Sequence, residues 1–317
     1  MSAAKSGAAA ARRVVAILGA GRMGADIALA FARGGWRCEV IETDARRAAE
    51  TAKYWARECR RLRLPRAAIR MHAANDGVAW RSVDLLIEAV TEDLALKRRL
   101  LRELEPRLRK DAFIATNTSG LRISEVTRVL ERPERSAGMH FMVPAHVILA
   151  VEITKGRHTA EATLRRFAGW VKALGKVAVV LRRDVPGMLI NRIQHAMYRE
   201  IFHLIDAGIV TAEDVDRAVR FGFGFRYPWL GPVVSRDIHG IPVHYATAKH
   251  LYPTLHNGKR PARVLAQLVK AGHHGVRTGR GFYRWDPATT DRRLRKYTAL
   301  LEASLKRIRR IGEPAEF

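Results

Sequence analysis

A glycine-rich turn is the feature that most constrains what this chain can fold into. The apolar run VVAIL ends in Gly19, Gly21 and Gly24, spaced G-x-G-x-x-G, where an apolar helical pattern begins. Gly19 permits a tight turn, Gly21 lets the backbone approach a phosphate, and Gly24 lets the helix pack closely on the strand. The amino end of such a helix offers N–H groups to phosphates. The stretch predicts a dinucleotide cradle; an ordinary strand, turn and helix in an Ala/Gly-rich chain is the alternative.

An acidic residue follows this turn at the distance that a ribose contact requires. The second apolar run, CEVIETD, contains Glu42 near its end, and Asp44 lies close by. A carboxylate there accepts hydrogen bonds from both ribose hydroxyls and repels a 2′-phosphate, which favours NAD over NADP. We therefore predict NAD as the cofactor, with Glu42 reading its ribose and with Arg22 and Met23 completing the glycine turn.

Strand-like runs alternate with amphipathic helical segments through the first half of the chain. This alternation is typical of a parallel sheet with right-handed crossovers. After about residue 184 only helical patterns follow, one of them opened by a capping box of Thr211 and Asp214. We predict an α/β fold, with an N-terminal Rossmann doubly wound parallel sheet and an all-α C-terminal domain. The expected parts are a disordered tail, an NAD-binding domain and a helical substrate and dimerisation domain, at residues 1–12, 13–183 and 184–317.

The charge of the chain is its unusual bulk property, with a formal net charge of +26. The basic residues are scattered and carry no nucleic-acid motif, so we favour a solvated basic surface over a specific nucleic-acid partner. No apolar run approaches the length of about 20 residues that spans a bilayer, so no membrane is expected. Cys38 and Cys59 form neither a disulfide framework nor a metal set, which indicates a reduced, cytoplasmic protein.

Polar residues stand where a doubly wound sheet presents its chemistry, at strand ends and at the domain join. The run AFIATNTS ends with Asn117 and Ser119, GMHF contains His140, AVEI contains Glu152, and MLINR places Asn191 at the start of the helical domain. Each could be structural: Asn117 or Asn191 could cap a helix. A carboxylate in an apolar strand such as that of Glu152 is costly without a partner. Taken together, these residues predict an active site.

The ordered motifs GAGRMG, NTS, HFMVP, AVE, PGMLINR and TGRGFY resemble the L-3-hydroxyacyl-CoA dehydrogenase family. This broad group includes L-gulonate 3-dehydrogenase, its lens-crystallin relatives and L-carnitine dehydrogenase. The resemblance covers residues 14–285. It implies an NAD-dependent oxidoreductase that pairs into a homodimer through its C-terminal domain, and a place in fatty acid metabolism.

The resemblance also assigns roles to the matching positions. His140 would be the general base that takes the hydroxyl proton while hydride leaves the same carbon. Glu152 would hold the imidazole in the right tautomer and stabilise the imidazolium. Ser119 and Asn191 would bind the substrate oxygen, and Asn117 would lie at the cofactor.

Two more positions match the family near the nicotinamide and its ribose. These are Glu92 and Lys97, both within the stretch TEDLALK.

Departures from the family pattern bear on the substrate. The family's usual His-Phe-Phe-Asn-Pro reads HFMVP here, and the span from Glu42 to Glu92 is short, with one basic helix where acyl-CoA enzymes carry a helical pair. The stretch FGFGFRYPWLGPV is closer to the gulonate and crystallin branch, and its Arg226 is a candidate clamp for a free carboxylate. We favour oxidation of an L-3-hydroxyacyl-CoA. The alternatives are a dehydrogenase of a free 3-hydroxy acid and a non-catalytic, crystallin-like NAD-binding protein.

Overall fold

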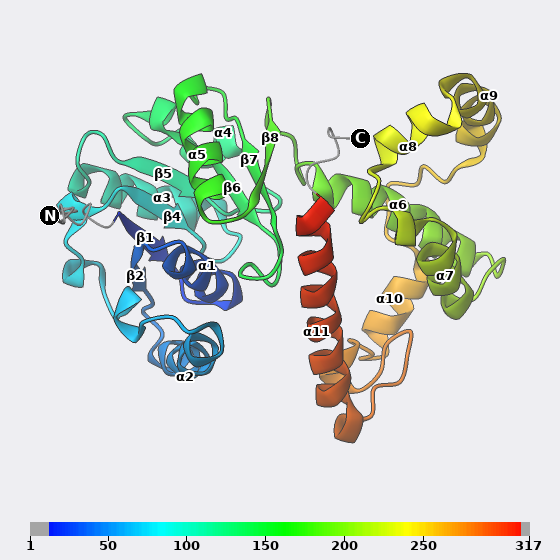
Figure 1. Ribbon diagram of the computed structural model, residues 1–317, viewed down its shortest axis with the longest axis horizontal. Helices are drawn as coiled ribbons and strands as arrows, with labels where there is room; N and C mark the ends of the chain where they lie inside the picture. The colour runs from blue at the N-terminus through cyan, green and yellow to red at the C-terminus, as the bar shows by residue number, and fades with distance from the viewer. Residues whose placement is uncertain (1–12, 312–317) are drawn as a thin grey trace, which may run out of the picture. The chain divides into compact units, whose positions relative to one another are not determined.

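The computed structural model describes residues 13–311, so the predicted disordered tail, residues 1–12, lies outside the described residues. A single eight-stranded sheet runs in the order β3-β2-β1-β4-β5-β6-β7-β8 (Figure 1). Its strands are β1 Val14–Leu18, β2 Arg37–Ile41, β3 Ile69–His72, β4 Leu85–Glu88, β5 Phe113–Thr116, β6 Ser136–Phe141, β7 Ala150–Thr154 and β8 Val177–Leu181. This is the predicted Rossmann-type architecture.

The sheet is parallel through β6 and then reverses. β7 pairs antiparallel with β6, with His140 opposite Glu152, and β8 pairs parallel with β7. The predicted Rossmann doubly wound parallel sheet is therefore confirmed, with β7 as the strand that reverses. The physical reason is the connection at residues 142–149, which carries no helix and is too short for a parallel crossover. β3 and β8, which form the two edges of the sheet, were not anticipated from the sequence.

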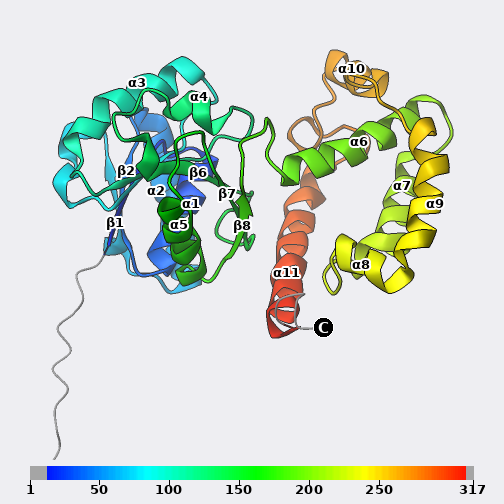
Figure 2. The same ribbon diagram turned by 90° about the horizontal axis from the view of Figure 1, so that it is seen from above.

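Helices cover both faces of the sheet and bury two separate apolar clusters (Figure 2). α1, α2 and α5 contribute to one cluster, which contains Phe31, Trp36 and Phe167. α3 and α4 contribute to the other, which contains Leu101 and Val126. Strands buried on both faces read as continuous apolar runs, as VVAIL and VDLLIEAV do. These helices are α1 Arg22–Arg33, α2 Ala45–Leu62, α3 Leu94–Leu104, α4 Ile123–Thr127 and α5 Glu161–Ala173.

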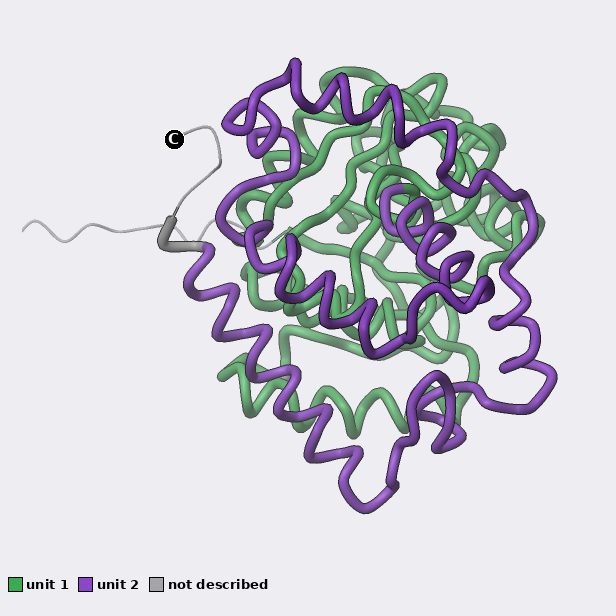
Figure 3. Tube along the Cα trace, turned by 90° about the vertical axis from the view of Figure 1, so that its right-hand side faces the viewer, with its two compact units in different colours: residues 1–192 green, residues 193–317 purple. Residues whose placement is uncertain are grey.

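The remainder of the chain is helical. The described chain divides into two compact units between Arg192 and Ile193 (Figure 3), slightly beyond the predicted boundary near residue 184. The Thr211 hydroxyl accepts a hydrogen bond from the Asp214 N–H and opens α7, as the capping pattern predicts. No helix among residues 13–311 is long and apolar enough to cross a membrane. These helices are α6 Ile190–Asp206, α7 Ala212–Ala218, α8 Pro232–His239, α9 Ile241–Leu251, α10 Arg263–Lys270 and α11 Pro287–Ile311.

The three glycines of the turn are required for different reasons. Gly19 has φ +90°, in the left-handed region that favours glycine. A Cβ at Gly24 would lie 1.9 Å from the Gly19 carbonyl oxygen, so helix α1 and the turn are in direct backbone contact. A Cβ at Gly21 would meet nothing within 4 Å, so this position is open on the side where a ligand would approach.

Two substitutions, Gly24→Ala and Gly21→Ala, distinguish the role of a glycine in helix packing from its role in ligand binding. We expect Gly24→Ala to destabilise the protein by about 1–3 kcal/mol or more, because its methyl group overlaps a backbone oxygen. Gly21→Ala should leave the free energy of unfolding within about 0.5 kcal/mol of the wild type and weaken NAD binding. Urea denaturation and NADH titration measure the two effects. A Gly21→Ala variant with undiminished NAD affinity would contradict the phosphate-cradle interpretation.

Candidate active site

Glu42 holds the glycine turn against the start of α2. Its carboxylate accepts hydrogen bonds from the N–H of Ala20 at 2.9 Å and of Asp44 at 3.0 Å. Arg47 adds an ion pair at 3.3 Å. Asp44 is itself the N-cap of α2, accepting from the Arg47 N–H. Glu42 is therefore the acid of this pair that reaches the turn, and its predicted contact with a ribose stays a prediction.

The amino end of α1 suits the pyrophosphate of a dinucleotide. Gly21 is the N-cap and no side chain caps the helix, so the first turn presents backbone N–H groups without a competing carboxylate. Arg22 and Met23 form that first turn. Together with the open space at Gly21, this geometry fits the predicted cofactor.

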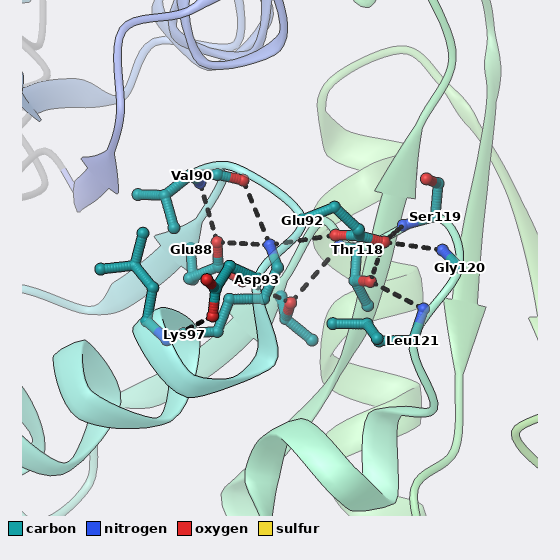
Figure 4. A network of polar contacts seen from close by, with 11 residues as sticks. Glu88, Val90, Glu92, Asp93, Lys97, Thr118, Ser119, Gly120 and Leu121 are labelled. Atoms are coloured by element: carbon teal, nitrogen blue, oxygen red, sulfur yellow. Dashed lines mark hydrogen bonds and ion pairs between the residues drawn. The ribbon is translucent and has the colours of Figure 1, made fainter.

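A buried ion pair joins the end of β4 to helix α3 (Figure 4). Lys97 is 1% exposed, and its Nζ lies 2.7 Å from the Glu88 carboxylate and 3.3 Å from that of Glu92. Glu88 also accepts a hydrogen bond from the Thr116 hydroxyl at 2.7 Å. Because an unpaired charge is costly in the interior, these groups fix one another and leave Lys97 little freedom to move.

Glu92 continues this network into the NTS loop. Its Oε1 accepts hydrogen bonds from the Thr118 hydroxyl at 2.5 Å, the Ser119 N–H at 3.0 Å and the Gly120 N–H at 2.8 Å. Burial raises the pKa of Glu92, but these donors and Lys97 outweigh it, so the pKa lies below its ordinary value. The ionised carboxylate thus sets the backbone on which the exposed Ser119 hydroxyl stands.

His140 and Glu152 form a buried pair across β6 and β7. His140 Nδ1 lies 2.7 Å from Glu152 Oε2, and the two residues are 5% and 0% exposed. They face one another because they occupy opposed positions of an antiparallel ladder. The carboxylate of Glu152, which is unexpected in an apolar strand, thus has His140 as its partner.

The second oxygen of Glu152 organises the start of α6. Oε1 accepts hydrogen bonds from the N–H groups of Leu189 and Ile190, both at 2.8 Å. Burial raises the pKa of Glu152, but the hydrogen bonds from His140 and from these N–H groups together bring it below its usual value. Asn191 follows directly in the first turn of α6, half-buried. One carboxylate therefore anchors both the imidazole and the turn that carries Asn191.

Asn117 connects the NTS loop to the strand of His140. Its Oδ1 accepts a hydrogen bond from the Phe141 N–H at 2.9 Å, next to the imidazole-bearing residue. Its observed contact is thus with β6, and its predicted place at the cofactor stays a prediction.

The loop between His140 and Glu152 has an anchor that the sequence analysis missed. Asp26 on α1 is buried, accepts hydrogen bonds from the Tyr54 hydroxyl at 2.5 Å and the Ala145 N–H at 3.0 Å, and lies 3.1 Å from His146 Nδ1. Lys176 Nζ donates to the carbonyl of Ala145 at 2.6 Å. His146, the histidine nearest to His140 in sequence, therefore pairs with Asp26 and not with Glu152.

The structure connects the predicted residues of the first unit around Glu92, Asn117 and Glu152, whereas Arg226 lies outside these networks. Glu92 reaches Ser119, Asn117 reaches β6, and Glu152 reaches both His140 and the turn before Asn191. Arg226 belongs to the second unit, where it is exposed and its guanidinium lies over the Phe225 ring.

Glu88 is a further residue that the sequence analysis missed. It is an acid inside the apolar run VDLLIEAV, so the argument applied to Glu152 would have found it.

Comparison with known proteins matches this arrangement to one family over nearly the whole described chain. Residues 14–185 match the family model described as "3-hydroxyacyl-CoA dehydrogenase, NAD binding domain", and residues 187–285 match "3-hydroxyacyl-CoA dehydrogenase, C-terminal domain".

One related sequence and two related crystal structures align with most of the chain. A 5-formyl-3-hydroxy-2-methylpyridine 4-carboxylate 5-dehydrogenase from Mesorhizobium japonicum is 30% identical over 88% of this chain and 92% of its own length. A crystal structure of an enzyme of that name, described as an NAD+ dependent dismutase, aligns with a TM-score of 0.88 at 27% identity, covering 94% of this chain and 99% of the other. The (S)-3-hydroxybutyryl-CoA dehydrogenase of Ralstonia eutropha aligns with a TM-score of 0.68 at 30% identity, over 87% and 99%.

Replacing Glu152 by glutamine tests the buried carboxylate. Folding lowers the pKa of Glu152 below 4.5, so the ionised group contributes stability above that pH, and the contribution is lost as the pH falls through the folded-state pKa. We expect Glu152→Gln to be about 1–3 kcal/mol less stable near neutral pH, with a gap that narrows in acid. Urea unfolding from neutral pH to below the Glu152 pKa measures the stability difference and its narrowing in acid. Glu50→Gln, at an exposed acid, should change stability little, and equal acid sensitivity of Glu152→Gln and the wild type would contradict the assignment.

Proposed function

Because the chain belongs to the 3-hydroxyacyl-CoA dehydrogenase family, a family of NAD-dependent dehydrogenases that act on CH–OH groups, we propose that it oxidises an L-3-hydroxyacyl-CoA to the 3-oxo compound. NAD is its cofactor. The single observation that carries the proposal is the buried His140–Glu152 pair, since it supplies an oriented base beside the strand ends of a dinucleotide-binding fold.

The hydrogen bond to Glu152 prepares His140 to act as the base. An ionised carboxylate can only accept hydrogen bonds, so Nδ1 of a neutral His140 carries the ring proton. Nε2 then has a free lone pair, which can accept the substrate hydroxyl proton. As that O–H bond breaks, the carbon–oxygen double bond forms and the carbon releases hydride. Bound NAD supplies the acceptor for this hydride. Glu152 then stabilises the imidazolium, because a nearby carboxylate favours the charged form of a buried histidine.

Ser119 and Asn191 are suited to hold the reacting oxygen. Within residues 13–311, neither the Ser119 hydroxyl nor the Asn191 amide makes a hydrogen bond, whereas the backbone around each is tied to a carboxylate, that of Glu92 or of Glu152. Both side chains therefore retain donors for a substrate oxygen. We assign to Glu92 and Lys97 the support of the NTS loop and the cofactor side of the site.

Replacing the base tests the mechanism. We expect His140→Ala to lower kcat by about 10²- to 10⁴-fold and to leave NADH affinity near that of the wild type, because the imidazole acts on the substrate proton. Steady-state kinetics and NADH fluorescence titration measure the two quantities. His158→Ala, at an exposed histidine of the same unit, is the matched control and should retain full activity. Undiminished turnover in His140→Ala would remove this mechanism.

A free hydroxy carboxylate is the second candidate substrate, and specific observations favour it. The relative with a TM-score of 0.88 is named for a pyridine carboxylate, whereas the hydroxybutyryl-CoA enzyme aligns at 0.68. Between Glu42 and β3 the chain has the single helix α2 and no helical pair to cover CoA. Val143 replaces the family's asparagine, and Arg226 offers a guanidinium for a carboxylate.

A substrate panel decides between these candidates. NAD reduction at about 340 nm would be followed with L-3-hydroxybutyryl-CoA, L-gulonate, L-carnitine and the pyridine carboxaldehyde named above, at equal concentrations. If the acyl-CoA is the substrate, we expect its kcat/KM to exceed the others by about 10²-fold or more. A free acid as the best substrate, with activity reduced in Arg226→Ala, would establish the second candidate. Tight NAD binding with no turnover of any compound would favour the non-catalytic alternative.

The remaining expectations concern partners and location. We propose a homodimer through the C-terminal unit, whose exposed apolar side chains include Phe221, Val233 and Tyr245. Cytoplasmic location and a role in fatty acid metabolism stay predictions, as does the absence of a specific nucleic-acid partner.

A further inference from the structure

A hollow lined by arginines lies away from the glycine turn. Its wall is made by Arg13, which precedes β1, and by helix α5, and it is an open surface depression of about 470 Å³. Arg13 stands at the amino end of β1, whereas the glycine turn follows its carboxyl end, so the two features lie at opposite ends of this strand. The residues that line this feature, named here the Arg13 hollow, are Arg13, Ala162, Arg165, Arg166, Gly169 and Trp170.

The Arg13 hollow carries positive charge that is not neutralised. Among the described residues, none of the guanidinium groups of Arg13, Arg165 and Arg166 is ion-paired. Arg13 lies over the Trp36 ring, at 5.7 Å from its centroid. Glu161 opens the same helix; its carboxylate pairs with Lys155 and also attracts Arg165 electrostatically. Three guanidinium groups, none of them in a direct ion pair, therefore line one concave surface and outnumber this one carboxylate.

A buried donor without an acceptor belongs to the same wall. Trp170 is 6% exposed, and its indole Nε1 has no hydrogen-bond partner among the described residues. Its ring packs edge-on against Trp36 and Phe113, so it is held in place. This N–H is buried behind the wall, so the ring contributes its apolar surface to the hollow. Gly169 leaves the wall open, since a Cβ there would meet nothing within 4 Å.

We propose that the Arg13 hollow is a second phosphate-binding site, distinct from the glycine turn, which takes a pyrophosphate group that is free or carried by a nucleotide. Guanidinium groups bind phosphate oxygens in pairs, and three of them match the charge of two linked phosphates better than that of one. The two sites use different chemistry. The glycine turn offers backbone N–H groups to a dinucleotide, whereas the Arg13 hollow offers side-chain charge.

Calorimetric titration with inorganic pyrophosphate tests the site, with the enzyme held in excess NADH so that the glycine turn is filled. We expect the wild type to bind pyrophosphate at least about tenfold more tightly than orthophosphate. Arg165→Ala/Arg166→Ala should lose about tenfold or more of this affinity. The matched control is Arg99→Ala/Arg102→Ala, which removes the same charge from exposed positions on α3 and should bind as the wild type does.

Variants of the wall keep the test independent of total charge. Gly169→Glu should abolish binding by placing a carboxylate in the Arg13 hollow, whereas Gly169→Ala adds a methyl group to open space and should retain it. Circular dichroism would verify that each variant is folded.

The outcomes distinguish a free pyrophosphate from one carried by a nucleotide, and they include results that would overturn the proposal. ADP that binds with NADH in place, and loses affinity in Arg165→Ala/Arg166→Ala, identifies a nucleotide-borne pyrophosphate; binding of inorganic pyrophosphate without ADP identifies the free anion. Equal weakening in both double variants would show general attraction to a basic surface and overturn the proposal. Displacement of NADH in step with pyrophosphate binding would place the anion at the glycine turn and overturn it as well.

Discussion

A carboxylate buried in an apolar strand must be hydrogen-bonded, and the satisfaction of Glu152 shapes the centre of this molecule. One oxygen meets His140 across the only antiparallel ladder between named strands in the described sheet, and the other meets the N–H groups of Leu189 and Ile190. The tautomer of the imidazole and the start of α6 therefore depend on one group. Loss of its charge would disturb both, because each has its buried partner in this carboxylate.

Other acids extend the same principle. Glu42 and Glu88 are buried: Glu42 ties the glycine turn to α2, and Glu88 ties β4 to Lys97 and β5. Glu92, which is partly exposed, ties the start of α3 to the NTS loop. Asp26 ties α1 to the loop after His140. Each carboxylate receives several donors from separate segments, so the polar groups near the site are held in place by the protein itself. Such preorganisation is what electrostatic catalysis requires.

Local patterns accounted for much of the fold. The glycine turn, the basic helix that follows β2 and the capping box at Thr211 are short-range features, and the structure has them where the sequence predicts them. The residues His140 and Glu152 were identified together through a family resemblance, and Glu152 also through its apolar strand. Their contact could not be read from spacing, because it requires β7 to run antiparallel to β6, which the expected parallel sheet would not allow.

The sequence by itself determined the nucleotide-binding half, the helical remainder and the candidate residues for the chemistry, because these depend on periodicity and on short motifs. Only the tertiary structure decided which polar groups from distant segments meet. Asp26 and Ala145 are 119 residues apart, and Ser119 and Glu92 are 27 apart. The Arg13 hollow likewise unites the residue before β1 with helix α5. Such contacts are set by the packing of distant segments, which leaves no periodic signal along the chain.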